Sequence, residues 1–152
     1  MLDNLRSFLS DLVRGGDGAR HFEAGDMRLA AAALLVHVAD ADGKFSNEER
    51  KRAQALVGER FQLDTAEAAQ LVREAVASDH EEVGVDYFVN VLTRALDSDA
   101  RLKIVSMMWD LVFADGNVND AEDSMVWRIG EMLGVKAEEL ETLRRSRMPD
   151  TD

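Results

Sequence analysis

One short segment occurs twice in this chain, and the repeat constrains the fold more than any other feature of the sequence. Residues 41–49 (ADGKFSNEE) align without gaps on residues 114–122 (ADGNVNDAE), at an offset of 73. The copies share Ala, Asp and Gly at their start and Glu at their end. An apolar helical pattern precedes each copy, and another helical pattern follows it. Repetition of this kind indicates related structural units, so we expect two pseudo-symmetric halves, about residues 26–77 and 99–146.

Hydrophobic residues recur at helical spacing along most of the chain, and no segment alternates like a strand. The pattern predicts an all-α fold: a single compact domain of about seven or eight helices. The expected helices cover residues 2–14, 26–41, 47–60, 65–77, 83–96, 99–114, 120–133 and 137–146. Ser46, Asp64 and Asn119 each precede a Glu by three positions, which is the spacing of a capping box. In 83–96 the predicted buried stripe consists of Tyr87, Phe88, Val91, Leu92, Ala95 and Leu96.

Residues 1–18 are expected to form an amphipathic helix and a glycine-rich linker. The apolar side of the helix contains Leu2, Leu5, Phe8, Leu9, Leu12 and Val13. This helix is expected to pack on the body of the protein or on a second copy. Any contact with a membrane would be made by this helix, although its balanced charges are less suited to a membrane surface than an excess of Lys and Arg would be. The oligomeric state therefore stays open. The helical domain is expected over 19–148, followed by a disordered tail over 149–152.

Composition excludes several functional classes. The chain has 30 Asp and Glu against 18 Lys and Arg, a formal net charge of −12, which would repel the phosphates of a nucleic acid. It has no cysteine, so disulfides, thiolate metal sites and thiol nucleophiles are excluded. It shows no basic leader and no long apolar run, and we expect a cytoplasmic protein. The expected partner is another protein, most naturally a cationic one.

The repeated turn has a structural explanation and a functional one. Gly43 and Gly116 permit the left-handed backbone of a helix end, and the glutamates complete capping boxes. An aspartate at a helix C-terminus, however, meets the unfavourable end of the helix dipole, and a bound cation would relieve this conflict. The predicted metal ligands are Asp42 and Glu49, with Asp40 in support, and Asp115 and Glu122, with Asp110 in support. All are oxygen donors, which favours a hard divalent cation, Ca²⁺ or Mg²⁺. Capped turns without a metal remain the alternative.

An EF-hand is a further interpretation of the first turn, and the sequence argues against it. Several residues of 40–49 fit loop positions of that motif. The leading Asp, however, is replaced by Val38 and, in the second copy, by Leu111. An apolar side chain cannot bind calcium, so we expect continuous helix before each turn.

The segments HVADADGKFSNEE and VFADGNVNDAE resemble the A-D-G-x-φ-(S/N)-x-x-E signature, with φ apolar, of the TerB-like family. That family includes tellurite-resistance protein B and the N-terminal region of DjlA-type co-chaperones. The similarity covers roughly residues 25–146, with the motif in two copies. The resemblance implies an all-helical domain of two related halves with an acidic surface, an association with tellurite and stress resistance, a proposed metal-binding role and no established catalysis. The family's acidic turn residues fall on Asp42, Glu49, Asp115 and Glu122.

These features predict a non-enzymatic, acidic binding or scaffold module linked to stress or tellurite resistance. A divalent cation at the two turns is its expected cofactor. The alternatives are a purely structural protein-interaction domain without metal and a metal-dependent hydrolase. A hydrolase would need a general base beside the cation, and His21, His37 and His80 are scattered along the sequence. We therefore expect no catalytic residues.

Overall fold

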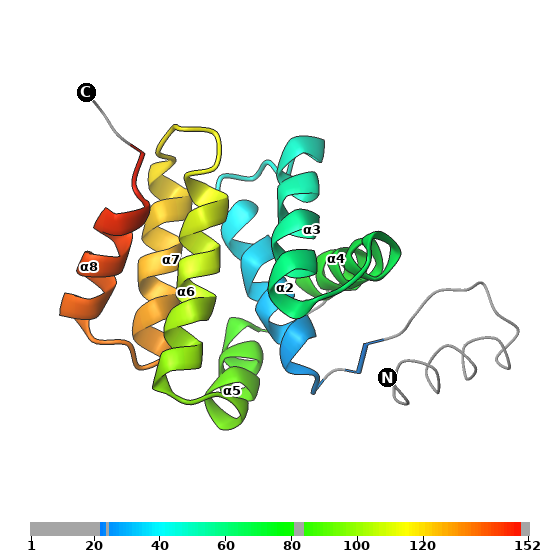
Figure 1. Cartoon of the computed structure of the whole chain (residues 1–152), viewed down its shortest axis with the longest axis horizontal. Helices are drawn as coiled ribbons and strands as arrows, with labels where there is room; N and C mark the ends of the chain where they lie inside the picture. The colour runs from blue at the N-terminus through cyan, green and yellow to red at the C-terminus, as the bar shows by residue number, and fades with distance from the viewer. Residues whose placement is uncertain (1–21, 24, 81–83, 150–152) are drawn as a thin grey trace, which may run out of the picture.

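The computed structural model describes residues 22–23, 25–80 and 84–149, and the helix predicted over 2–14 lies outside them. The described residues form seven α-helices and no strand, which confirms the all-α prediction. The helices are α2 (Met27–Ala39), α3 (Asn47–Phe61), α4 (Thr65–His80), α5 (Val85–Ala95), α6 (Ser98–Val112), α7 (Asp120–Met132) and α8 (Ala137–Arg147) (Figure 1). None of these helices combines the length and the apolar character that crossing a membrane requires.

Side-chain caps determine where most of the helices begin. The residue before α2, α3, α6 or α7 accepts a backbone N–H from the first turn of its helix, and Asp64 accepts one at the start of α4. The capping residues are Asp26, Ser46, Asp64, Asp97 and Asn119. Each such bond satisfies a backbone N–H that has no partner within the helix. The three starts predicted from cap spacing are therefore correct.

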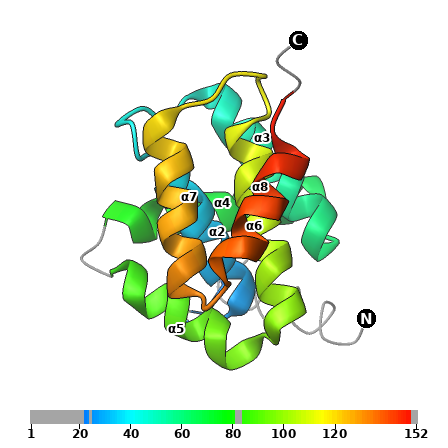
Figure 2. The same cartoon turned by 90° about the vertical axis from the view of Figure 1, so that its left-hand side faces the viewer.

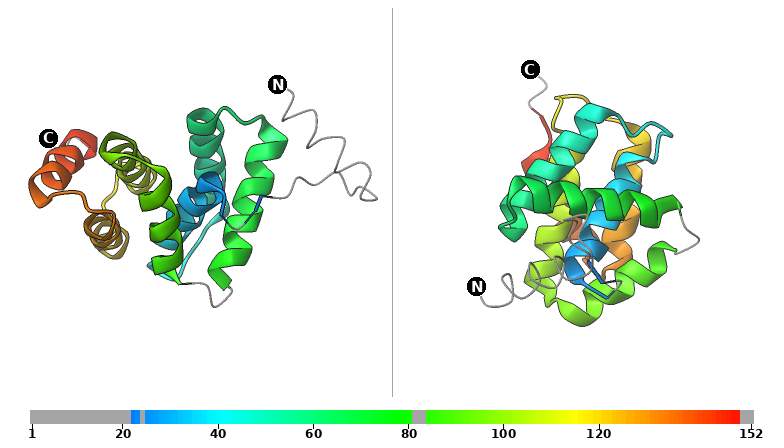
Figure 3. Two further views of the ribbon diagram at one scale, coloured as in Figure 1. Left: turned by 90° about the horizontal axis from the view of Figure 1, so that it is seen from below. Right: turned by 90° about the vertical axis from the view of Figure 1, so that its right-hand side faces the viewer.

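α2 is the central helix, and its sequence is apolar on nearly every side. Ten of its 13 residues are buried, because it packs against α3, α4, α5, α6 and α7. Figure 1 shows it between α3 and α4 on one side and α6 and α7 on the other, and the view from below in Figure 3 shows the same order. A helix that is hydrophobic all round is expected to be buried in this way.

The two halves place their repeated turns at the same end of the molecule. The first half contains α2, α3 and α4, and the second contains α6, α7 and α8. The α2–α3 and α6–α7 turns lie together at the top of Figures 1 and 2, and α5 lies at the bottom. Because α2 also packs directly on α6, segments 73 residues apart in the sequence become neighbours.

α5 buries a narrower face than the sequence predicts. Phe88 and Leu92 are buried, whereas Tyr87 is 42% exposed and Ala95 is also exposed. The inclusion of Tyr87 and Ala95 in the buried stripe is therefore wrong. The physical reason is that α5 packs mainly against a single helix, α2, which covers only part of its apolar surface.

A polar contact joins the three helices of the second half. Trp109 on α6 is fully buried, and its Nε1–H donates to Asp123 Oδ1 on α7 at 3.0 Å. Arg144 on α8 donates to both oxygens of the same carboxylate, with Nε to Oδ1 at 2.9 Å and Nη2 to Oδ2 at 2.7 Å. Burial of an indole N–H without an acceptor would be costly, so Asp123 makes this packing possible.

Candidate functional site

The two repeated turns have the same backbone construction. Asp42 Oδ1 accepts the backbone N–H of Lys44 at 2.9 Å, and Asp115 Oδ1 accepts that of Asn117 at 3.0 Å. In both turns the glycine that follows the aspartate has a φ of +80°, the left-handed conformation expected from the sequence. A side chain that bonds to the backbone two residues later forms an Asx turn. Each aspartate therefore has a local structural role that spacing alone did not reveal.

The helix before each turn ends earlier than predicted, at Ala39 and at Val112. Asp42 and Asp115 therefore lie three residues beyond the last helical residue. The helix dipole loses its influence within about one turn of the helix end. The expected conflict between aspartate and dipole is consequently absent, and it does not support a metal site.

The two repeated glutamates differ in orientation although they occupy equivalent sequence positions. Ser46 Oγ accepts the N–H of Glu49 at 3.1 Å, and Glu49 Oε1 accepts the N–H of Ser46 at 3.3 Å, which completes the capping box. Asn119 Oδ1 accepts the N–H of Glu122 at 3.0 Å, but the return bond is not formed between these described residues. The Glu122 side chain is instead buried, with 6% of the residue exposed. The predicted box at α7 is therefore half formed.

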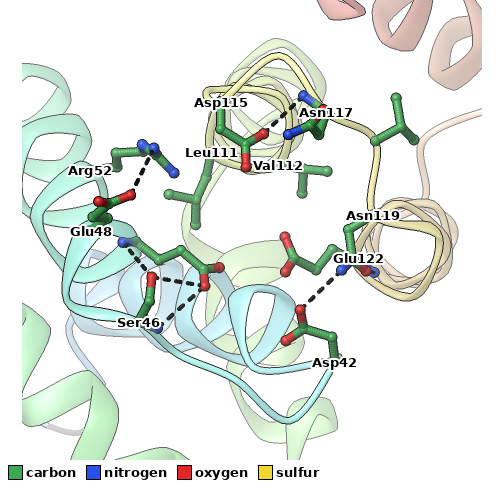
Figure 4. A pocket seen from close by; sticks show the side chains of 12 residues that line it. Asp42, Ser46, Glu48, Arg52, Leu111, Val112, Asp115, Asn117, Asn119 and Glu122 are labelled. Atoms are coloured by element: carbon green, nitrogen blue, oxygen red, sulfur yellow. Dashed lines mark hydrogen bonds and ion pairs between the residues drawn. The ribbon is translucent and has the colours of Figure 1, made fainter.

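Both turns line one cavity of about 250 Å³ where the two halves meet (Figure 4). Four of the six predicted ligands are on its wall: Asp42 and Glu49 from the first half, and Asp115 and Glu122 from the second. In Figure 4 the Glu122 carboxylate points toward Asp42 across the space between the turns. The tertiary fold therefore combines two separate sequence motifs in a single site.

The cavity wall is strongly acidic. Glu48 also lines it, so the described lining contains five carboxylates and one basic side chain, Arg52. The Arg52 Nη2 atom lies 3.7 Å from Glu48 Oε2, so the positive charge of Arg52 is paired with the carboxylate of Glu48. Neither residue is among the ligands predicted from the sequence, although their spacing of four positions places them on one helix face beside Glu49.

Glu122 is the most strongly perturbed group in the cavity. Burial raises the pKa of Glu122 to about 8, and the nearby charges of Glu49, Asp42 and Asp115 and a hydrogen bond with Asp42 contribute to the rise. A carboxyl group with this pKa holds a proton at neutral pH. The protonated acid can donate a hydrogen bond to a neighbouring carboxylate, which reduces the repulsion within the cluster.

A hydrogen bond also joins the two halves directly across the cavity. Asn119 Nδ2 donates to Asp42 Oδ2 at 3.0 Å. The same asparagine caps α7 through its Oδ1 atom. Asp42 therefore uses one oxygen in its own turn and the other in contact with the second half.

The two predicted supporting ligands, Asp40 and Asp110, do not line the cavity. Asp40 is the C-cap of α2, with its backbone N–H donating to Val36 O at 2.9 Å. Asp110 Oδ1 lies 3.4 Å from Arg147 Nη1 on α8. Burial raises the pKa of Asp110, and Arg147 opposes that rise.

The spacing of the carboxylates bears on metal binding. Across the part of the chain that the structure describes, no group of three or more His, Asp or Glu side chains is already arranged at metal-binding distance. The donor chemistry of the cavity fits a hard cation, but its described carboxylates do not form a preformed inner coordination sphere.

The fold and the cavity define a class of protein: an all-helical domain of two related halves that meet at a shared acidic site. The sequence model of the family described as tellurite resistance protein TerB matches residues 28–145. The chain belongs to this family. Comparisons with curated proteins and with solved structures give no significant match.

Proposed function

We propose that the protein is a non-enzymatic binding module whose acidic cavity takes up a divalent cation, Ca²⁺ or Mg²⁺, between its two halves. The observation that carries the proposal is the convergence of the four repeated carboxylates on one cavity, with Glu122 buried at its wall. Carboxylates held close together repel each other unless a proton or a cation lies between them. A cation that contacts both turns would therefore stabilise the packing of one half on the other.

The spacing of the carboxylates supports one mode of binding over another. Because no three of them are already at direct ligand distance, the ion would keep part of its water shell and contact some carboxylates through water. Mg²⁺ commonly binds proteins in this way, and Ca²⁺ accepts water among its six to eight ligands.

A non-enzymatic role fits the position of the described histidine side chain, His37, outside the acidic cavity. Metal-dependent hydrolysis needs a general base beside the ion. His37 lines a different cavity, with Asp86 and Arg128, and its Nδ1 lies 3.0 Å from Asp79 Oδ1. The partner of the module is proposed to be a protein with a cationic surface, since the chain carries a net charge of −12. A role in tellurite or stress resistance would follow from this binding.

Calorimetric and thermal titration of the full chain with Ca²⁺ and with Mg²⁺ would test the cation proposal. Micromolar to millimolar ion should raise the melting temperature, because preferential binding to the folded state stabilises it by about 2.7 kcal/mol at 100 times the Kd. Asp42→Asn combined with Asp115→Asn should weaken both binding and stabilisation. Asp110→Asn is the matched control, since it removes an acidic charge outside the cavity. Equal titration curves for the parent and the double variant would contradict the proposal.

A purely structural interaction domain is the second candidate, and specific contacts favour it. The Asx turns, the Ser46–Glu49 capping box and the Asn119–Asp42 hydrogen bond each give a metal-independent role to a residue of the cluster. On this hypothesis Asp42→Asn would lower the stability of the parent without any effect of added cation. The titration of the parent therefore separates the two functions.

A further inference from the structure

We propose that the amphipathic segment of residues 2–14 docks on the exposed face of α5 in the same chain. α5 has two apolar stripes, and the described residues cover only one of them fully. Phe88 and Leu92 are buried in the core, whereas Tyr87, Val91 and Ala95 follow each other at intervals of four residues on another face. Tyr87 is 42% exposed and Ala95 is exposed, while Val91 between them is half-buried against the core. Among the described residues this second stripe is therefore only partly covered.

The partly covered stripe lines an open groove. The groove has a volume of about 580 Å³ and is formed by Gly25, Tyr87, Asn90, Val91, Arg94 and Ala95. A helix of 11 residues such as α5 is about 16 Å long, and residues 2–14 would form a helix of about 20 Å. The segment can therefore cover the whole stripe.

The chain enters the described body at the edge of this groove. Phe22 is buried, and its backbone N–H donates to both carboxylate oxygens of Glu74 on α4, at 3.1 and 3.2 Å. The Arg28 guanidinium lies 5.0 Å from the centroid of the Phe22 ring. Gly25, three residues further on, forms part of the groove wall. These contacts fix the point where the preceding segment is attached.

The connection favours the chain's own segment over a second copy. Residues 15–21 span at most about 25 Å when fully extended, which allows residues 2–14 to reach a groove that begins at Gly25. A short tether gives the segment a high effective concentration at the groove. The polar side of the segment carries Asp3 and Asp11 as well as Arg6 and Arg14, so its balanced charge does not oppose docking beside Arg94.

Paramagnetic relaxation in the full chain would test this docking. The protein has no cysteine, so Ser7→Cys gives a single site for a spin label on the polar side of the predicted helix. We expect strong loss of amide signal for Val91 and Ala95 and little loss along α8. A second sample mixes spin-labelled chains that contain no ¹⁵N with ¹⁵N chains that carry no spin label. In this sample only contacts between two chains can reduce the signal, and we expect no loss. Loss at α5 in the mixed sample would show docking on a second copy and would overturn the proposal.

Substitutions on either side of the contact provide the remaining controls. Tyr87→Ser on the groove and, separately, Leu9→Ser on the segment should each reduce the signal loss at α5. Val118→Ser is the matched control, because Val118 is the other large apolar residue exposed among those described and lies in the α6–α7 turn. The proposal would be overturned if the spin-labelled parent showed no signal loss at α5. It would also be overturned if the loss were the same in Tyr87→Ser and in Leu9→Ser as in the parent.

Discussion

Replacement of Glu122 by Gln should stabilise the protein, by an amount that increases with pH. Glu122 is buried in the acidic cavity, and burial together with the neighbouring carboxylates disfavours its charged form. Gln has nearly the same shape and cannot ionise. Its amide can also donate to the Asp42 carboxylate in place of the protonated acid.

The size of the effect follows from the two pKa values. Glutamate has an ordinary pKa of 4.5, and that of Glu122 in the folded chain is about 8. Between these pH values the folded state holds a proton that the unfolded state has lost, so the free energy of unfolding falls as pH rises. At about 1.36 kcal/mol per pH unit, Glu122 costs the folded state about 1 kcal/mol at pH 5 and about 3 kcal/mol at pH 7. The cost levels off above pH 8.

Thermal unfolding of the parent and Glu122→Gln at pH 5 and pH 7, without divalent cation, would measure this difference. The variant should melt roughly 10 °C higher at pH 7 and only a few degrees higher at pH 5. Glu131→Gln is the matched control, since it removes an exposed carboxylate from the same helix and should change stability by less than about 0.5 kcal/mol. A gain of equal size at both pH values would refute the reasoning, because titration of Glu122 would then contribute nothing.

Three further predictions concern the cavity and the fold. If Glu122 is a ligand, cation binding at pH 7 should release about 0.9 proton per ion, because the Glu122 carboxyl must lose its proton. Calorimetry in buffers of different ionisation enthalpy measures this release, and a value of zero would exclude Glu122 as a ligand. Asp123→Ala should lower the free energy of unfolding in urea by about 2–3 kcal/mol, because a buried indole N–H and a guanidinium lose their acceptor; a loss near zero would contradict this role. Gly43→Ala and Gly116→Ala should each cost about 1–2 kcal/mol in the same assay, since both have a φ of +80°. Unequal costs would show that the turns are not equivalent.

The sequence predicts which residues of the two turns come together at the acidic cavity, but not how that cavity is built. The repeat identifies Asp42, Glu49, Asp115 and Glu122, and all four line one cavity. Asp40 and Asp110 are grouped with them because they lie close in sequence, but neither lines the cavity. Closeness in sequence does not tell whether a side chain faces the cavity between the two halves or another helix. Asp110, for example, lies beside Arg147 on α8.

The difference between the two glutamates also depends on tertiary structure. Glu49 and Glu122 have the same position relative to a helix cap, and local chemistry predicts the same capping box for both. Only Glu49 completes it, because the Glu122 side chain is buried where the two halves meet. This burial is the main cause of its raised pKa, and Glu49 and Asp42, which lie more than 70 residues away in the sequence, raise it further.

The sequence by itself determined the helices, their starts and the two equivalent turns, since helix periodicity, capping and glycine conformation depend on residues within about four positions of each other. The tertiary structure decided that these turns share one acidic cavity, that Glu122 is buried in it, and that the other described helices cover only part of the apolar surface of α5. Each of these features depends on the packing of α2 against α5 and α6, and this packing joins residues whose distance in space is unrelated to their separation along the chain.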